Sequence, residues 1–305
     1  MFQGCGTALV TPFRSSDSAL DEDCLRRLVR RQIESGIHFL VPCGTTGENP
    51  TLSRAEHLRV VEITLEEAKG KIPVLAGCGG NDTRQVAELA QELESLGADG
   101  LLVVTPYYNK PTPDGLFEHY QAVARASRLP IVVYNVPGRT GLNVDPATLA
   151  RLARIDTVVG VKEASGNISQ IAAVFQVVPS DFVVLSGDDA LTLPVISLGG
   201  AGVISVASNE VPYAMARMVS LCLEGDFPGA CEMHRRLHAL MEINFIESNP
   251  GPVKAALAMM GQLEPVFRLP VVAPRADSLK KIEKVLLDLG LIPGGSDHVE
   301  VPFGD

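Results

Sequence analysis

The sequence lacks any excess of basic residues. It has 26 Lys and Arg against 36 Asp and Glu, which gives a formal net charge of −10 and a pI near 5.1. Nucleic-acid binding needs a basic surface, so this balance argues against a nucleic-acid partner. No apolar run approaches the ~20 residues of a membrane-spanning helix, and residues 1–4 contain no basic segment leading into an apolar one. We therefore expect a cytoplasmic protein with no signal peptide and no membrane partner.

Cysteine pairs with metal-binding spacing are also absent. No Cys-x-x-Cys motif occurs, and we expect reduced, buried thiols at Cys5, Cys24, Cys43, Cys78, Cys222 and Cys231. His234 and His238 have a metal-compatible spacing on a predicted helix, but no third ligand is evident. An ordinary helix face is the favoured interpretation, so no metal site is expected.

Short apolar runs alternate with helical patterns up to about residue 224. The runs are near-continuously apolar, as strands buried on both faces of a parallel sheet are, and they cover residues 6–13, 39–43, 73–78, 100–105, 131–135, 158–163, 182–186 and 202–206. A helical segment follows each run. Two segments carry start signals, a capping box at residues 53–56 and Asp145 before a first-turn proline.

Eight strands that are each followed by a helix predict an α/β protein with a (β/α)8 TIM barrel. An open doubly wound sheet is the alternative. A Gly-x-Gly-x-x-Gly motif does not follow the first strand, which weakens the dinucleotide-binding version of that alternative.

The helical pattern breaks at Glu224-Gly225-Asp226-Phe227-Pro228, which we interpret as the end of a catalytic barrel covering residues 1–224. Residues 225–293 are predicted to form a small C-terminal helical domain, with helices over 229–245, 251–260 and 277–289. We expect this domain to act as an oligomer contact or a lid. Residues 294–305 are glycine-rich and polar, and a flexible tail is expected there.

The stretch around Lys162 carries the strongest chemical signal. Lys162 is the only lysine inside a predicted strand, and Val158, Gly160 and Ala164 are expected to share its face. Burial disfavours the charged form of a lysine and makes the neutral amine available, which is what a Schiff-base nucleophile needs. The alternative is a lysine at a frayed strand end whose ammonium reaches solvent.

Function in such a barrel gathers where the strands end. The loop Gly44-Thr45-Thr46-Gly47-Glu48 offers backbone N–H groups for a small carboxylate, or is an ordinary glycine-rich loop. Tyr134 ends the strand before that of Lys162, and adjacent strands lie ~4.8 Å apart. Its phenol either passes protons or only packs. Arg139 follows in the next loop and either binds a substrate carboxylate or is simply solvated.

Six motifs together resemble, in order and spacing, the family of dihydrodipicolinate synthases and N-acetylneuraminate lyases, and most closely its synthases of lysine biosynthesis. The motifs are Gly44-Thr45-Thr46-Gly47-Glu48, Thr105-Pro106-Tyr107-Tyr108-Asn109-Lys110-Pro111, Tyr134-Asn135-Val136-Pro137-Gly138-Arg139-Thr140-Gly141, Gly160-Val161-Lys162-Glu163-Ala164, Leu185-Ser186-Gly187-Asp188-Asp189 and Gly202-Val203-Ile204-Ser205. The resemblance covers about residues 2–291, including Asn249-Pro250 and Pro252-Val253-Lys254. Each motif alone is weak, but six in register are specific.

The resemblance implies a class I aldolase-like enzyme. Lys162 would form an imine with pyruvate, and the derived enamine would attack the aldehyde of L-aspartate 4-semialdehyde. Tyr134 would donate and accept protons. Thr45 and Tyr108 would complete a proton relay, with Tyr108 reaching in from a neighbouring subunit.

The resemblance also implies the substrate contacts and the assembly. Thr46, Gly187 and the Ile204 backbone would hold substrate, with pyruvate at Thr46 and Ile204, and Arg139 would bind the semialdehyde carboxylate. Members of the family are typically homotetramers built as dimers of dimers. They need no metal or organic cofactor beyond the covalent imine.

Two other functions remain as alternatives. An N-acetylneuraminate lyase or a 2-keto-3-deoxy sugar acid aldolase would keep the same lysine and tyrosine, whereas Arg139, the Thr45-Thr46 pair and Tyr108 favour the synthase. A ligand-binding barrel without turnover is disfavoured because every position of the imine and relay machinery is filled. The fold by itself does not decide, since the barrel hosts many chemistries.

Finally, the resemblance implies an inhibitory lysine pocket at a dimer interface, where this sequence departs from lysine-inhibited members. Three matching positions are His57, Asn81 and Tyr107, and the changed ones are Asn49, Pro50, Arg54 and Gln85. Gln85 removes the carboxylate that would pair with the ligand's side-chain ammonium, and Arg54 adds a positive charge. Weak inhibition by lysine, or none, is therefore predicted.

Overall fold

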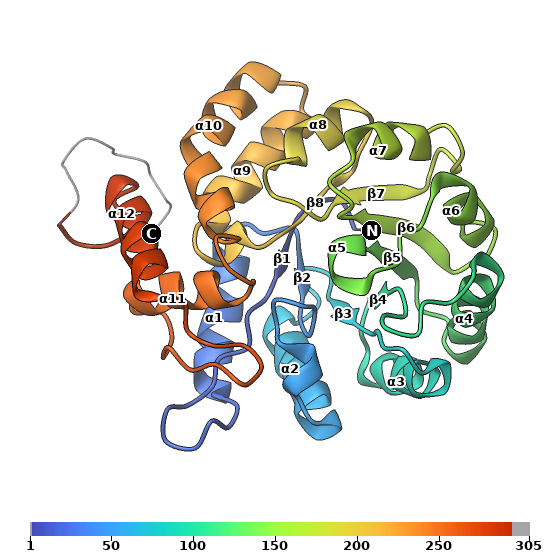
Figure 1. Ribbon diagram of the computed structural model, residues 1–305, viewed down its shortest axis with the longest axis horizontal. Coiled ribbons are helices and arrows are strands. Elements are labelled where there is room, and N and C mark those ends of the chain that lie inside the picture. Colours follow the sequence, from blue (N-terminus) through green and yellow to red (C-terminus); the bar gives the residue numbers. More distant parts are fainter. Residues whose placement is uncertain (1, 295–305) are drawn as a thin grey trace.

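A barrel of eight parallel strands forms the centre of the computed structural model, which describes residues 2–294 (Figure 1). The strands are β1 (Gly4–Ala8), β2 (Phe39–Val41), β3 (Leu75–Gly77), β4 (Gly100–Val104), β5 (Ile131–Asn135), β6 (Val158–Glu163), β7 (Val183–Ser186) and β8 (Gly202–Ser205). Their order is β2-β1-β8-β7-β6-β5-β4-β3. A parallel bridge between Leu40 and Val74 joins β2 to the segment entering β3 and closes the ring. The predicted (β/α)8 barrel is confirmed.

Helices surround the strands on the outside of the barrel (Figure 1). They are α1 (Glu22–Glu34), α2 (Arg54–Ala68), α3 (Thr83–Leu96), α4 (Pro113–Ala126), α6 (Pro146–Leu152), α7 (Ile168–Val174), α8 (Thr192–Ser197) and α9 (Pro212–Leu223). Three short helices lie in the loops that follow β2, β5 and β8: the 3-10 helix η1 (Asn49–Thr51), α5 (Pro137–Thr140) and the 3-10 helix η2 (Ala207–Asn209). Both predicted start signals are confirmed. Ser53 and Glu56 form a capping box at α2, and the Asp145 side chain accepts from the Thr148 N–H at α6.

The first strand differs from its predicted range of 6–13. It begins at Gly4, which pairs with Gly202 of β8, and ends at Ala8. Beyond Ala8 the Leu9 N–H still donates to the Val41 carbonyl oxygen of β2 at 3.0 Å, but the polar groups of the next residues make contacts outside the sheet. The Val10 N–H donates to Asn209 Oδ1 at 3.1 Å, and Thr11 Oγ1 donates to the Gly47 carbonyl oxygen at 2.7 Å. The predicted strand therefore extends too far beyond Ala8, because buried apolar residues continue past the end of the strand pairing.

A second difference lies in β6. The pairing with β5 shifts between Ile131–Val158 and Val132–Gly160, so β6 contains a bulge at Val159. Val158 consequently packs in the outer cluster between strands and helices, whereas Ala164 packs against the cluster inside the barrel. The prediction that Val158 shares the face of Lys162 was wrong, because one extra residue reverses the alternation of faces.

Apolar side chains fill the barrel interior toward the N-terminal ends of the strands. Phe2 and Phe39 meet edge to face, with ring centroids 5.7 Å apart. Leu75, Val132 and Leu185 belong to the same interior cluster. This packing closes one end of the barrel and leaves the polar strand ends at the other.

Three further helices follow the barrel: α10 (Phe227–Ile243), α11 (Gly251–Met259) and α12 (Ala276–Asp288). In Figure 1 they lie on the side of α1 and α9. The predicted break is present between Leu223 and Phe227, while the division into two domains stays a prediction. Of the predicted tail at 294–305, all but Gly294 lies outside the described residues.

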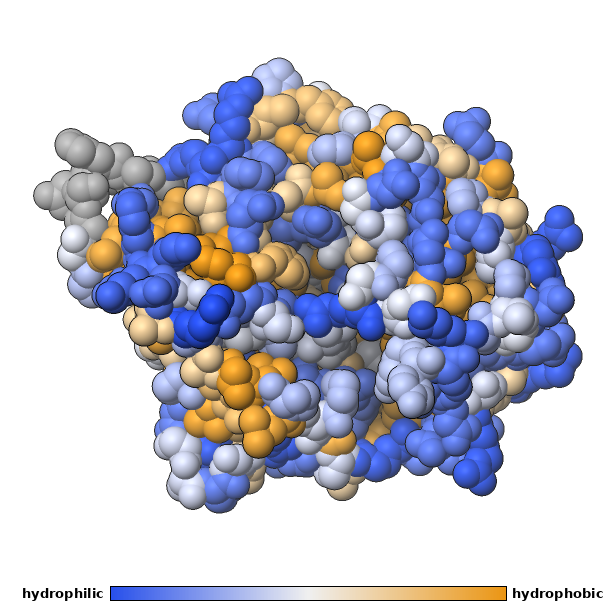
Figure 2. Space-filling view, in the orientation of Figure 1, coloured by the Kyte–Doolittle hydropathy of each residue, from blue (hydrophilic) through white to orange (hydrophobic). Residues whose placement is uncertain are grey.

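The surface carries an apolar area on the face shown in Figure 2. Apolar side chains gather over the loop between α11 and α12, where Leu269 is 79% and Val272 59% exposed. Over residues 2–294, none of the helices combines the length and the apolar character needed to cross a membrane.

Candidate active site

Lys162 and Tyr134 lie opposite each other on adjacent strands. They are direct partners in the parallel ladder between β6 and β5. The Lys162 Nζ lies 4.2 Å from the centroid of the Tyr134 ring, and each residue is 6% exposed. The phenol therefore lies as near to the amine as the order of the strands predicted. Neither residue is at a frayed end that reaches solvent.

A cavity opens onto the Lys162 amine at the C-terminal ends of the strands. Its walls are Thr45, Thr46, Tyr134, Val136, Arg139, Lys162, Ala164, Gly187, Asp188, Val206, Phe245 and Asn249. A neighbouring cavity that reaches toward Tyr107 shares Thr45, Tyr134 and Arg139 as walls. The structure thus gathers six of the predicted site residues around one space.

The loop that carries Thr45 and Thr46 is held by successive turns. The Gly47 N–H donates to the Gly44 carbonyl oxygen and the Glu48 N–H to that of Thr45, both at 3.1 Å. Thr46 is only 3% exposed, and its Oγ1 accepts from Asn249 Nδ2 at 3.1 Å. These contacts fix both threonines at the edge of the cavity.

The strand ends beneath the amine are tied together by a buried polar pair. Asn135 Nδ2 donates to both carboxylate oxygens of Glu163, at 3.0 and 3.2 Å, and the Ser165 N–H donates to Glu163 Oε1 at 2.8 Å. Because Asn135 follows Tyr134 and Glu163 follows Lys162, this pair locks the relative height of the two site residues.

Gly187 lies against the lysine side chain. Its N–H donates to the Glu163 carbonyl oxygen at 2.8 Å. A Cβ at this position would lie 2.6 Å from the Ala164 Cβ and 3.1 Å from the Lys162 Cε. The close approach of the loop to the reactive side chain therefore requires glycine here.

The next residue but one in this loop, Asp189, joins it to the end of β8. Its Oδ2 accepts from the N–H groups of Val206 and Ala207, both at 3.0 Å. Complete burial raises the pKa of the Asp189 carboxyl, although the hydrogen bond from Ser205 and the two backbone bonds oppose the rise. This contact fixes the β7 and β8 loops relative to each other.

Three of the predicted site residues lie farther from the Lys162 amine or outside the cavity: Arg139, Ile204 and Tyr108. Arg139 is exposed at the cavity rim, where its Nη2 donates to the Asn249 carbonyl oxygen at 3.2 Å. Ile204 is buried in the barrel interior, and its side chain lines neither cavity of the described chain. Tyr108 is 90% exposed with φ +73° and is not brought to Lys162 within the chain.

The seven residues of the predicted lysine pocket line a third cavity, which also includes Asp82 and adjoins the cavity that reaches toward Tyr107. Arg54 Nε donates to Glu92 Oε2 at 2.8 Å, and Gln85 Nε2 donates to Asp82 Oδ2 at 3.1 Å. Burial lowers the pKa of His57 to about 4, so this imidazole is neutral near pH 7. Glu92 therefore partly neutralises the charge of Arg54. The Asp82 carboxylate lies close to the Gln85 amide, which by the resemblance replaces a carboxylate.

Sequence reasoning missed the buried contacts made by the C-terminal segment. Asn249 bonds Thr46, and Lys254 of α11 forms an ion pair with Glu48 in which both side chains are 0% exposed. The signal was present, because Lys254 stands alone among apolar residues in the helical run 252–258. A lysine in that setting is either exposed at the end of a flexible stem or buried with a partner.

One of the two histidines considered for metal binding has another role. His234 Nε2 donates to the Ala190 carbonyl oxygen at 3.0 Å. Over the described part of the chain, no group of three or more His, Cys, Asp or Glu side chains is arranged to hold a metal ion. The six cysteines are free, and five of them are buried.

Comparison with known proteins identifies the family. The model of the dihydrodipicolinate synthetase family matches residues 1–288. The 4-hydroxy-tetrahydrodipicolinate synthase of Koribacter versatilis is 51% identical over 291 residues, which are 95% of this chain and 97% of that protein. The crystal structure of dihydrodipicolinate synthase from Thermotoga maritima gives a TM-score of 0.93 at 46% identity, covering 96% of this chain and 100% of that one. That of the Acinetobacter baumannii enzyme complexed with pyruvate gives 0.94 at 40% identity, covering 96% and 100%. The chain belongs to the dihydrodipicolinate synthetase family.

Proposed function

We propose that this protein is a 4-hydroxy-tetrahydrodipicolinate synthase that condenses pyruvate with L-aspartate 4-semialdehyde through an imine on Lys162. The observation that carries the proposal is the Lys162 amine, which opens into a cavity walled by Tyr134, Thr45, Thr46 and Arg139. The relative from Koribacter versatilis carries this activity in its name, and the Acinetobacter baumannii relative was solved with pyruvate.

The first half of the reaction uses Lys162 and Tyr134. The neutral amine attacks the ketone carbon of pyruvate, a C–N bond forms, and the ketone oxygen leaves as water. Loss of a methyl proton then turns the imine into an enamine, which is nucleophilic at the former methyl carbon. The Tyr134 ring lies beside the amine, with its centroid 4.2 Å from Nζ, and its hydroxyl serves as the proton donor and acceptor for these steps.

The second half forms the carbon–carbon bond and releases the product. The enamine carbon attacks the aldehyde carbon of the semialdehyde, whose oxygen takes up a proton. The amino group of the semialdehyde next attacks the imine carbon, so the ring closes and the Lys162 amine leaves. Arg139 at the rim suits the semialdehyde carboxylate, and the Thr46 loop suits that of pyruvate.

The relay through Tyr108 requires a second copy of the chain. Tyr108 is 90% exposed and lines neither of the two cavities beside Lys162 and Tyr134 of its own chain. We propose a homotetramer in which this tyrosine reaches the Thr45 of a neighbouring subunit. Mixing Tyr108→Phe with Lys162→Ala subunits should then restore part of the activity, and no recovery in verified mixed oligomers counts against the shared site.

The test of the proposed reaction is a comparison of aldehydes. Purified enzyme is incubated with pyruvate and either L-aspartate 4-semialdehyde or N-acetylmannosamine and glyceraldehyde-type sugars. We expect turnover with the semialdehyde and little with the sugars. Turnover with a sugar aldehyde alone refutes the proposal in favour of a sugar acid lyase.

A further inference from the structure

The most deeply buried ion pair in the described chain lies next to the proposed pyruvate site but takes no part in the steps above. Lys254 Nζ in α11 lies 2.5 Å from Glu48 Oε1, and both side chains are fully excluded from solvent. Glu48 ends the loop whose other members, Thr45 and Thr46, line the cavity at Lys162. The pair thus connects the C-terminal helices to a loop of the site.

The surroundings of the pair are built for a cation and an anion. The Lys254 ammonium lies 4.4 Å from the centroid of the Phe13 ring and 5.5 Å from that of Phe267, within the range of cation–π attraction. The second carboxylate oxygen of Glu48 accepts from the Arg268 N–H at 3.3 Å. Burial lowers the pKa of Lys254, and the facing Glu48 carboxylate opposes that shift.

Glu48 adopts an unfavourable backbone conformation in this position. Its φ of +53° is in the left-handed region, which is unfavourable for a residue with a side chain. That backbone turn starts η1, where the Thr51 N–H donates to the Glu48 carbonyl oxygen at 2.9 Å. The ion pair therefore holds the loop in a turn that the Glu48 backbone does not favour by itself.

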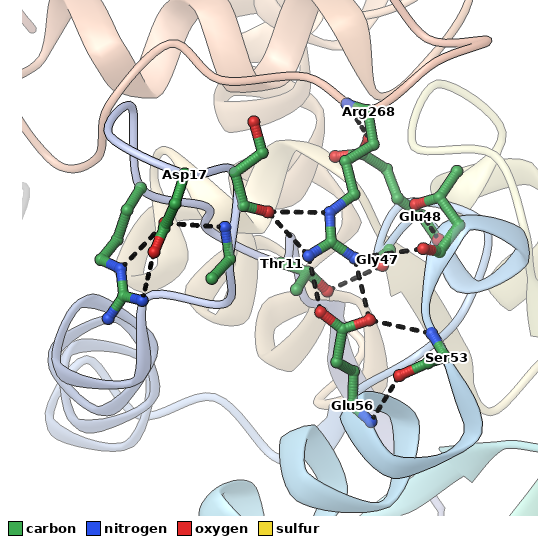
Figure 3. A network of polar contacts seen from close by, with 11 residues as sticks. Thr11, Asp17, Gly47, Glu48, Ser53, Glu56 and Arg268 are labelled. Atoms are coloured by element: carbon green, nitrogen blue, oxygen red, sulfur yellow. Dashed lines mark hydrogen bonds and ion pairs between the residues drawn. The ribbon is translucent and has the colours of Figure 1, made fainter.

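Further contacts from the C-terminal segment brace the same loop. Arg268 donates to the Thr51 carbonyl oxygen at 3.1 Å, to Glu56 at 2.6 Å and to the Ser18 carbonyl oxygen at 2.7 Å (Figure 3). Thr11 Oγ1 holds the Gly47 carbonyl oxygen from the opposite side of the loop (Figure 3). Contacts therefore hold the loop at Gly47 and at Glu48, and Lys254 bonds Glu48, two residues after Thr46.

We propose that Lys254 is a positioning residue for pyruvate: by holding Glu48 it sets the placement of Thr45 and Thr46 at the cavity, so α11 is part of the substrate-binding apparatus. The proposal rests on the proposed function of Lys162 and Thr46. A purely structural ion pair makes a different prediction, because well-packed neutral side chains can replace a buried pair without loss of stability.

The experiment uses the double variant Glu48→Gln/Lys254→Met in the full chain, which removes both charges and leaves no unpaired ion. Pyruvate binding is measured as the pyruvate concentration that gives half-maximal borohydride trapping on Lys162, beside KM, kcat and thermal stability. We expect a folded protein whose half-saturating pyruvate concentration rises about tenfold or more, because a misplacement of about 1 Å can cost about 10²-fold. The KM for the semialdehyde should change much less.

Lys284→Met is the matched control. This lysine of α12 is 74% exposed and pairs with Asp288 at 2.7 Å, so its loss should leave the half-saturating pyruvate concentration, KM and kcat unchanged. A folded double variant that binds pyruvate like the wild type overturns the proposal. Should the double variant not fold, Glu48→Gln alone decides, because the amide oxygen remains an acceptor for the Lys254 amine, whose pKa burial lowers once the facing carboxylate is gone: a raised half-saturation supports positioning, and an unchanged one overturns it.

The readout separates this proposal from the function on which it rests. Trapping requires only the imine and no turnover with an aldehyde. Absence of trapping in the wild type is a failure of the proposed function, whereas equal trapping in the wild type and the folded variant is a failure of the positioning role alone.

Discussion

Replacing Gly187 by alanine should disable the site without unfolding the barrel. The new Cβ would lie 2.6 Å from the Ala164 Cβ and 3.1 Å from the Lys162 Cε, whereas carbon atoms pack at about 3.5–4.0 Å. The Ala164 Cβ is fixed to the backbone, so relief of that contact requires a shift of roughly 1 Å in the Gly187 loop, and the contact with the Lys162 Cε is relieved by movement of the lysine side chain. Either movement displaces the imine-forming amine relative to the Tyr134 phenol.

The expected loss of activity follows from the displacement of the Lys162 amine. A misplacement of about 1 Å can cost about 10²-fold, so kcat/KM for pyruvate should fall by about that factor. Overpacking of this kind costs about 1–3 kcal/mol of stability, which a barrel of this size tolerates. Initial rates with pyruvate and the semialdehyde give the first quantity, and denaturant unfolding gives the second.

Gly138→Ala is the matched control for the Gly187 variant. A Cβ at Gly138 would meet nothing within 4 Å, and this residue lies at the same end of the barrel, in α5. We expect near wild-type kinetics from it. A Gly187→Ala enzyme whose kcat/KM lies within a factor of about three of wild type would refute the reasoning that the loop must approach the lysine this closely.

Three other predictions follow from the site and its surroundings. Tyr134→Phe should still form the pyruvate imine but turn over about 10²–10⁴-fold more slowly, and activity within a few-fold of wild type would show that the phenol only packs. L-Lysine should inhibit weakly or not at all, because the resemblance implies that Gln85 replaces a carboxylate of lysine-inhibited members and that Arg54 adds a positive charge; half-inhibition at submillimolar lysine, on the order of −4 to −5 kcal/mol of binding, would contradict this. The Arg268 guanidinium lowers the pKa of Glu56 to about 2, so this carboxylate stabilises the fold above its ordinary pKa of 4.5 and loses that effect as the pH falls toward 2. Glu56→Gln should therefore cost about 1–3 kcal/mol in urea unfolding at pH 7, and the difference from wild type should narrow below pH 4.5; a difference independent of pH would contradict the assignment.

The fold and the centre of the site could be predicted because each depends on local pattern. Near-continuous apolar runs marked the strands, and the position of Tyr134 one strand before Lys162 was enough to place the phenol beside the amine. The bulge in β6 could not be predicted, because nothing in the residue types around Val159 indicates that the pairing with β5 shifts there by one residue.

The C-terminal contacts were beyond sequence reasoning for a different reason. Lys254 and Glu48 are far apart in the chain, and nothing in either local pattern identifies the other as its partner. Arg54 shows the same limit, because its charge was expected in the lysine pocket and its pairing with Glu92 could not be foreseen. Long-range ion pairs depend on how helices pack, which periodicity does not report.

Reductive trapping of pyruvate tests the central claim most directly. The wild-type protein is incubated with pyruvate and borohydride, digested, and mapped by peptide mass, with Lys162→Ala treated in parallel. Because Lys162 presents its amine to the cavity beside Tyr134, we predict one reduced adduct, on Lys162, and none in the variant. An adduct on another lysine, or no adduct in the active wild-type protein, would contradict the account.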